Sequence, residues 1–195
     1  MTQFDTSITD YPGVMLNHLE VLYQPGEVEL ATLFMTALGF EVVDYDKVAS
    51  TGQRYLFVHL EPGDKDTVNN VFYLSEARSE QLELEAALQA ARGREPALGQ
   101  AWDAYVDKAV TKPHGIPHAG IRFQSFESLE VVLDRLNQVA ESELKGRVSV
   151  LAIAPGDPGS MSDRLLQAFV HTDVVASGLF GLGQVFELQG QRKDA

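Results

Sequence analysis

The feature that most constrains this chain is an internal repeat. A short strand, an amphipathic helix and three further strands follow one another twice in the 195 residues, first over residues 14–77 and again over residues 117–190. A repeat fixes many positions at once, so it is a stronger guide to the fold than any single segment. The sequence therefore predicts an α+β protein built from two βαβββ modules.

Each predicted helix carries apolar residues at the spacing of one helical face. In the first module these residues are Val28, Ala31, Phe34, Met35 and Leu38. In the second module they are Leu129, Val132, Leu133, Leu136 and Ala140. The remaining strands are predicted in the same order in both modules, at residues 40–45, 55–60 and 70–74 and then at 147–153, 166–173 and 184–188.

Residues 78–116 join the two modules. They read as two helical segments, 79–92 and 97–109, separated by the Gly-Arg-Glu-Pro sequence of residues 93–96. We therefore expect a helical linker between the modules. We also expect residues 1–195 to fold as a single domain, because two modules of this size can share one hydrophobic core.

Four of the five histidines occupy matched positions in the two modules. His18 and His118 stand at the first strand of each module, and His59 and His171 each end a Phe-Val-His triplet. The second module also has an acidic residue, Glu187, on its last strand. The matched histidines make the chain look like a duplicated metal-binding fold.

On these residues and this repeat, the chain resembles the vicinal oxygen chelate superfamily, which includes glyoxalase I, extradiol dioxygenases and bleomycin-resistance proteins. The resemblance implies that the modules form a cup-shaped mixed β-sheet with helices on the outside and a divalent metal ion inside. It assigns His18, His118 and Glu187 as metal ligands. Tyr73 stands on the last strand of the first module, where the resemblance would place a fourth ligand, and it is expected to line the substrate pocket.

Strand geometry supports this assignment independently, because successive side chains of a strand alternate between its two faces. In each module the apolar residues of the first strand should pack on the helix, which places His18 and His118 on the opposite face. Phe186 and Leu188 should also face the helix, which leaves Glu187 on the same side as the two histidines.

Two neutral imidazoles and one carboxylate suit Fe(II), and also Mn, Co, Ni or Zn. The resemblance to extradiol dioxygenases assigns His59 as the catalytic acid and base, with His171 as a second catalytic candidate. A histidine suits proton transfer because its ordinary pKa is about 6.5. Phe57, Phe169 and Arg122 are expected to line the substrate pocket.

The expected function is therefore that of an enzyme with one divalent metal ion, Fe(II) favoured, that acts on a small oxygen-rich or aromatic molecule. An extradiol-type dioxygenase is favoured. A glyoxalase-like isomerase or lyase is the alternative, because residues 177–183 lack the tyrosine and the Asp-Pro turn of the dioxygenase signature. A metal-free small-molecule (antibiotic-type) binding protein and a structural module that assembles with partners also remain open.

Composition limits the partners. A formal net charge of −13 argues against nucleic acid and anionic membranes, which attract basic surfaces. The chain has no cysteine, and residues 1–13 lack the features of a signal peptide. We therefore expect a cytoplasmic protein that binds a small-molecule substrate. We also expect a homodimer, because members of the superfamily often pair and the linker helices offer apolar surface.

Overall fold

The structure is a computed structural model that describes residues 16–45 and 55–192. The expected start of the first module at residue 14 and the N-terminal segment 1–13 lie outside the described residues. Within the described residues the chain forms two mixed sheets, of five and four strands, and four α-helices. The predicted α+β fold class is confirmed.

The first module follows the predicted order of elements. They are β1 (His18–Tyr23), α1 (Val28–Ala37), β2 (Glu41–Val43), β3 (Tyr55–His59) and β4 (Val71–Glu76). Strand β1 pairs in parallel with β4, and β4, β3 and β2 then pair in antiparallel fashion. A parallel neighbour for β1 requires the chain to cross over the sheet, and α1 is part of this crossover.

The second module repeats this arrangement. Its elements are β5 (Ala119–Arg122), α4 (Phe126–Glu141), β6 (Val148–Ile153), β7 (Leu165–Thr172) and β9 (Gln184–Gln191). Strand β5 pairs in parallel with β9, and the sheet order is β5-β9-β7-β6. Helix α4 begins at a capping box in which the side chains of Ser125 and Ser128 each accept a hydrogen bond from the other residue's backbone N–H.

Two short elements of the second module were not predicted. They are β8 (Val175–Ala176) and the single 3₁₀ turn η1 (Phe180–Leu182). Strand β8 pairs with β1 at Leu22 and Tyr23, so a strand from the second module extends the sheet of the first.

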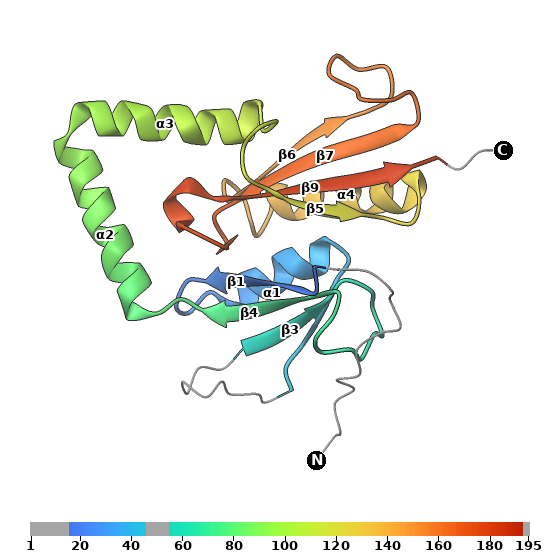
Figure 1. Cartoon of the computed structure of the whole chain (residues 1–195), viewed down its shortest axis with the longest axis horizontal. Coiled ribbons are helices and arrows are strands. Elements are labelled where there is room, and N and C mark those ends of the chain that lie inside the picture. Colours follow the sequence, from blue (N-terminus) through green and yellow to red (C-terminus); the bar gives the residue numbers. More distant parts are fainter. Residues whose placement is uncertain (1–15, 46–54, 193–195) are drawn as a thin grey trace.

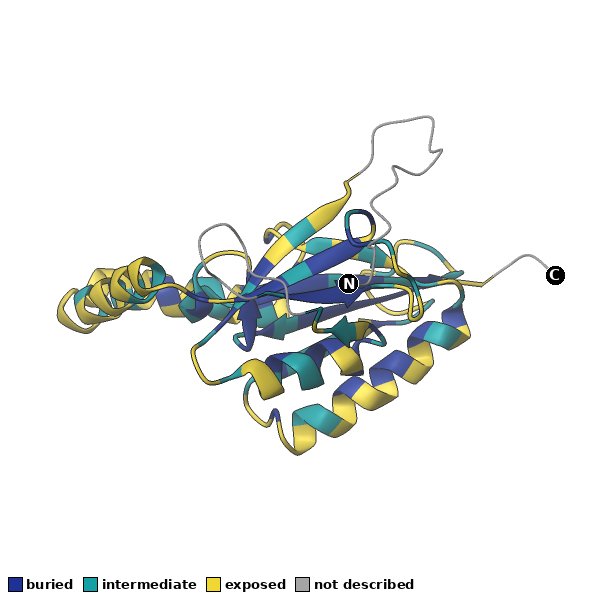
Figure 2. Cartoon of the chain, turned by 90° about the horizontal axis from the view of Figure 1, so that it is seen from below, coloured by how far each residue is buried: buried dark blue, intermediate teal, exposed yellow. Residues whose placement is uncertain are grey.

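The two modules share one hydrophobic core. Helices α1 and α4 lie on the same side of the sheets, and their buried faces turn toward the strands (Figure 2). Phe186 on β9 contacts residues of the first module, with ring centroids 5.8 Å from Phe34 and 6.1 Å from Phe72. Arg147, just before β6, adds a polar connection, because it donates to both carboxylate oxygens of Glu27 at 3.0 Å and to Asp173.

The sheet differs from the expected single cup. In the described residues no ladder joins β1 to β5, so the strands form two sheets that are held together by β8 and by the shared core. The repeat determines how strands pair inside a module. The separation of β1 from β5 depends on how the two modules pack, and strand patterns do not report that.

The linker contains helices α2 (Ser79–Arg94) and α3 (Pro96–Thr111), which extend from the body of the molecule as a bent arm (Figure 1). The arm returns to the second module, where Trp102 Nε1 donates to the carbonyl of Gly181 at 3.0 Å and Glu85 accepts the backbone N–H of Phe180 at 2.8 Å. In the described parts of the chain, no helix is both long enough and apolar enough to cross a membrane.

Candidate functional site

The predicted faces of the strands are confirmed. Leu19, Val21 and Tyr23 belong to the core or pack against it. Ala119, Ile121, Phe186 and Leu188 do the same in the second module. His18, His118 and Glu187 therefore lie on the faces turned away from α1 and α4.

His118 and Glu187 lie side by side on the second sheet. His118 Nε2 is 3.0 Å from Glu187 Oε2, and His118 Nδ1 is 2.7 Å from the carbonyl oxygen of Ile116. Because a carbonyl oxygen only accepts hydrogen bonds, Nδ1 carries a proton and Nε2 is the atom left for Glu187. Without a proton or a metal ion between them, Nε2 and the carboxylate oxygen would be two acceptors facing each other. The contact therefore requires one or the other.

Glu187 is also held by two glutamines. Gln167 and Gln189 each donate an amide N–H to Glu187 Oε1 at 2.7 Å. Burial alone would raise the pKa of Glu187, but these hydrogen bonds and the nearby His118 outweigh it and hold the pKa below its usual value. The other amide atom of Gln167, Oε1, is buried without a hydrogen-bond partner in the described part of the chain. The carboxylate is therefore fixed and ionised at neutral pH.

Arg122 extends this polar network along the sheet. Its guanidinium donates to the amide oxygens of Gln189 at 2.8 Å and Gln191 at 3.1 Å. Together His118, Glu187, Gln189 and Arg122 form the polar row, the name we use for these four residues below. Arg122 lies next to Gln189, and its role in lining a substrate pocket remains a prediction.

His18 lies apart from the polar row. Its ring stacks on Tyr73 with centroids 4.7 Å apart, and Tyr73 donates its hydroxyl to the carbonyl of Thr67. Over residues 16–45 and 55–192, no group of three or more His, Cys, Asp or Glu side chains is placed to hold a metal ion. The structure thus brings two of the three predicted ligands together, and the three-residue metal site remains a prediction.

The two catalytic candidates have structural contacts. His59 is 0% exposed, its Nε2 is 3.2 Å from the Tyr45 hydroxyl, and its Nδ1 has no hydrogen-bond partner in the described residues. His171 Nε2 donates to the carbonyl of Leu182 at 3.2 Å. Neither imidazole is placed beside the polar row by any observed contact, and their catalytic roles stay predictions.

The two phenylalanines expected to line a substrate are both covered. Phe57 is 4% exposed within an aromatic cluster that includes Tyr45, Tyr55 and Tyr73. Phe169 is 3% exposed and packs in a second small core with Ile153 and Val185, beneath Ala109 of α3. Helix α3 and the cluster therefore occupy much of the space that an open cup would leave for a ligand.

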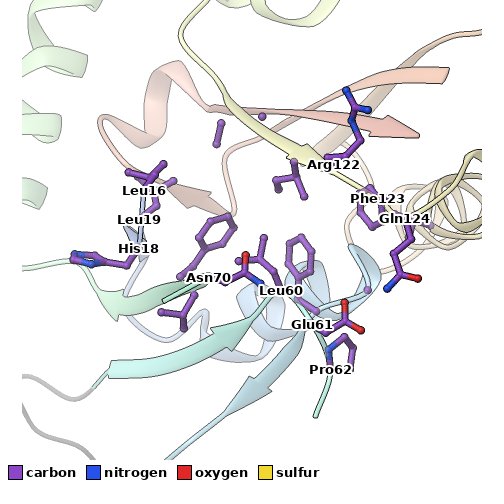
Figure 3. Close-up of a pocket in the computed structure, with 18 of the residues that line it drawn as sticks. Leu16, His18, Leu19, Leu60, Glu61, Pro62, Asn70, Arg122, Phe123 and Gln124 are labelled. Atoms are coloured by element: carbon purple, nitrogen blue, oxygen red, sulfur yellow. The ribbon is translucent and has the colours of Figure 1, made fainter. Parts of the chain in front are cut away.

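The open space lies between the modules. A cavity of about 680 Å³ separates the start of β1 from β5, and its floor comes from α4 and from Gly39 and Phe40, which follow α1. In Figure 3 the His18 and Arg122 side chains point away from this cavity on opposite sides. The apolar part of the remaining lining consists of Leu16, Leu19, Phe40, Leu60, Pro62, Val71, Phe72, Ala119, Ile121, Phe123 and Val132. The polar part consists of Asn17, Glu61, Asn70, His118, Gln124, Ser128 and Arg135. We call this cavity the inter-module slot.

Sequence reasoning did not find the slot. Its walls come from residues in both modules that each read as ordinary core positions, such as Leu19 and Ile121. Only the short β5 and the glycine within it, Gly120, hint at an open edge, because a strand glycine often marks a close approach of another chain or ligand.

Comparison with known proteins gives little further guidance. The sequence matches no protein-family profile and no curated protein. Among solved structures, the fold is similar to an integron cassette protein from the mobile metagenome of the Halifax Harbour sewage outfall, with a TM-score of 0.39 and 13% identity over 90% of this chain and 99% of that chain.

Proposed function

We propose that this protein binds a small, largely apolar molecule in the inter-module slot. The main support is the cavity itself. Its volume of about 680 Å³ lies within the ~300–1,000 Å³ range of ligand pockets. Such pockets combine apolar walls with polar groups that orient the ligand, and the slot contains both kinds of side chain. His118 lines the slot and joins it to the polar row, which can fix the orientation of a ligand.

An apolar dye tests this proposal. Anilinonaphthalene sulfonate should bind the wild-type protein with an increase in fluorescence, and Ile121→Asn should weaken the binding because it puts an amide on the slot wall. Val150→Asn is the matched control, since Val150 is also partly buried against the main core but does not line the slot. Equal dye binding by both variants would place the dye, and the proposed ligand, elsewhere.

A metal-dependent enzyme is the second candidate, and the contact between His118 and Glu187 favours it. Two ligands of one metal ion that lie about 2.1 Å from it at a right angle are roughly 3 Å apart, the separation found here. The bond from Nδ1 to Ile116 is the kind of contact that orients a metal-binding histidine. A single divalent ion, Fe(II) favoured, held by these residues would support the vicinal oxygen chelate chemistry, either dioxygenase or isomerase and lyase.

Metal titration separates the two candidates. If the enzyme proposal holds, Glu187→Gln should lose divalent metal affinity, whereas Glu20→Gln should not, because Glu20 instead accepts a hydrogen bond from Ser75 on the other sheet. The titration should use Fe(II) without oxygen, and then Mn, Co, Ni and Zn. Oxygen uptake with a panel of catechols would support ring cleavage. Equal metal binding by the two variants would remove the metal proposal and leave the apolar slot unaffected.

A further inference from the structure

The inter-module slot lies between two strand edges that have no strand partner within residues 16–45 and 55–192. On one side β1 pairs with β4 along its whole length, but it meets β8 only at Leu22 and Tyr23. On the other side β5 has a single neighbour in the described residues, β9. Among the described residues, the first part of β1 and all of β5 therefore each present an open edge.

The hydrogen bonds of β1 identify which backbone groups face the slot. The carbonyls of Asn17 and Tyr23 accept from Val71 and Ala77, so the odd-numbered residues of β1 point toward β4. Successive residues of a strand direct their N–H and C=O groups to opposite edges. His18 and Glu20 must therefore direct these groups away from β4, toward the open edge.

The same reasoning applies to β5. Phe123 N–H donates to the carbonyl of Gln189 at 2.8 Å, so the odd-numbered residues point toward β9. Gly120 and Arg122 then direct their N–H and C=O groups to the other edge, and both residues line the slot. The slot is thus bordered on both sides by alternating backbone donors and acceptors.

We infer that the ligand of this slot is an extended peptide segment that adds a strand between β1 and β5. The inference rests on the proposed role of the slot as a binding site, but it gives the slot a peptide in place of a small apolar molecule. An apolar molecule without amides would leave backbone groups on both edges without partners, and unpaired polar groups are costly where water is excluded. An extended peptide satisfies both edges at once, as in known cases of strand addition.

The two faces of the added strand define its sequence pattern. Alternate side chains would enter the apolar floor near Leu19, Phe72 and Ile121. The others would lie on the opposite face, near His118 and Arg122, where polar side chains are accommodated. A peptide of alternating apolar and polar residues therefore fits the slot, and its backbone would join the two sheets into one.

Hydrogen exchange measured by NMR tests this inference directly. The probe is a capped peptide of alternating Thr and Val residues, and the reference is the same peptide with its alternate amides N-methylated. The unmodified peptide should slow exchange at the amides of His18, Glu20, Gly120 and Arg122. The N-methylated peptide should protect them far less, because its methyl groups prevent the close backbone approach that lets the peptide carbonyls accept from these amides.

Two variants at one position supply the control. Gly120→Pro removes the slot-facing N–H without touching the ladder between β5 and β9, and proline is tolerated where a strand N–H faces outward. Gly120→Ala keeps that N–H, and an added Cβ meets nothing within 4 Å. Peptide affinity should fall about tenfold in Gly120→Pro, the loss expected for one backbone hydrogen bond, and stay near wild type in Gly120→Ala.

The other outcomes are distinguishable. Dye binding that is sensitive to Ile121→Asn, without protection by the peptide, would overturn the peptide inference and keep the small-molecule function. Loss of both would overturn the two proposals together. A third outcome is that the four amides become protected as protein concentration rises, without peptide, and that light scattering gives the mass of a dimer. A second copy of this chain would then occupy the slot, and the peptide inference would be overturned.

Discussion

The two modules share a topology but not a surface. Tyr73 and Glu187 occupy the same position in the ladder of each module, on the last strand beside the first. Burial, with the nearby Tyr55, Glu20 and Asp66, raises the pKa of Tyr73, whereas the hydrogen bonds around Glu187 lower its pKa. Equivalent positions therefore favour a neutral group in one module and a charged one in the other.

The faces turned away from α1 and α4 are also covered differently. In the first module the aromatic rings around Phe57 pack on one another. In the second module α3 packs over Phe169, and the polar row occupies the part of the sheet toward β5. The two modules therefore share the core that holds them together, whereas the faces turned away from α1 and α4 differ because they do not form that core.

The largest expected loss of stability comes from a substitution in the shared core. Phe186→Ala should lower the free energy of unfolding by about 3–5 kcal/mol, because Phe186 is fully buried and contacts aromatic rings of the other module. Urea denaturation should show one transition by circular dichroism and by the fluorescence of Trp102. Separate transitions for the two signals would mean that the modules do not depend on one core.

Two glycines with similar positive φ differ in what surrounds them. Gly63 in the first module and Gly183 in the second both have positive φ, +86° and +74°. Gly63→Ala should cost about 1–2 kcal/mol from backbone strain alone, because an added Cβ has open space there. At Gly183 the Cβ would lie 2.2 Å from His171 Nε2, which adds a clash of about 1–3 kcal/mol.

Urea denaturation midpoints of both glycine variants check this prediction. The control combines His171→Ala with each glycine variant. Removing the ring should relieve the clash caused by Gly183→Ala and should leave the cost of Gly63→Ala unchanged. Equal destabilisation by the two single variants would show that the His171 ring moves freely and does not hold the turn before β9.

The polar connection between the modules gives a moderate effect. Arg147→Ala should cost about 1–3 kcal/mol, because Arg147 donates to Glu27 of one module and Asp173 of the other. Arg92→Ala is the control, since Arg92 pairs with exposed Asp103 within the linker and such surface pairs contribute about 0–1 kcal/mol. Equal losses in the two variants would contradict a special role for the connection between modules.

The smallest expected effect is a change in how the free energy of unfolding depends on pH. Because the pKa of Glu187 is lowered in the folded state, its contribution to stability is present above the unfolded pKa of about 4.3 and is lost as pH falls through the folded pKa. Because the pKa of Tyr73 is raised, its contribution is present below about pH 10 and is lost as pH rises through the folded pKa.

Unfolding measured across pH tests both signs. Glu187→Gln should flatten only the acid side of the stability profile, and Tyr73→Phe only the alkaline side. If either variant changed both sides equally, the opposite behaviour of the two equivalent positions would be refuted.

The fold could be predicted in large part because it depends on local patterns. The stripe of Ala31, Phe34 and Met35 specifies a helix with one buried face, and alternation in β1 and β5 determines which side chains meet that helix. The same alternation placed His118 and Glu187 on one face, where they are in contact. It could not show that His18 stacks on Tyr73, because sharing a face does not set the distance between side chains.

The sequence by itself determined the two βαβββ modules, their helical linker and the side of the sheet that carries each histidine. These features follow from periodicity, which acts over a few residues. The tertiary structure decided that α3 covers Phe169, that His59 is buried, and that β1 and β5 stand apart around a slot. These features depend on how whole elements pack against one another, and many packings are compatible with the same apolar pattern.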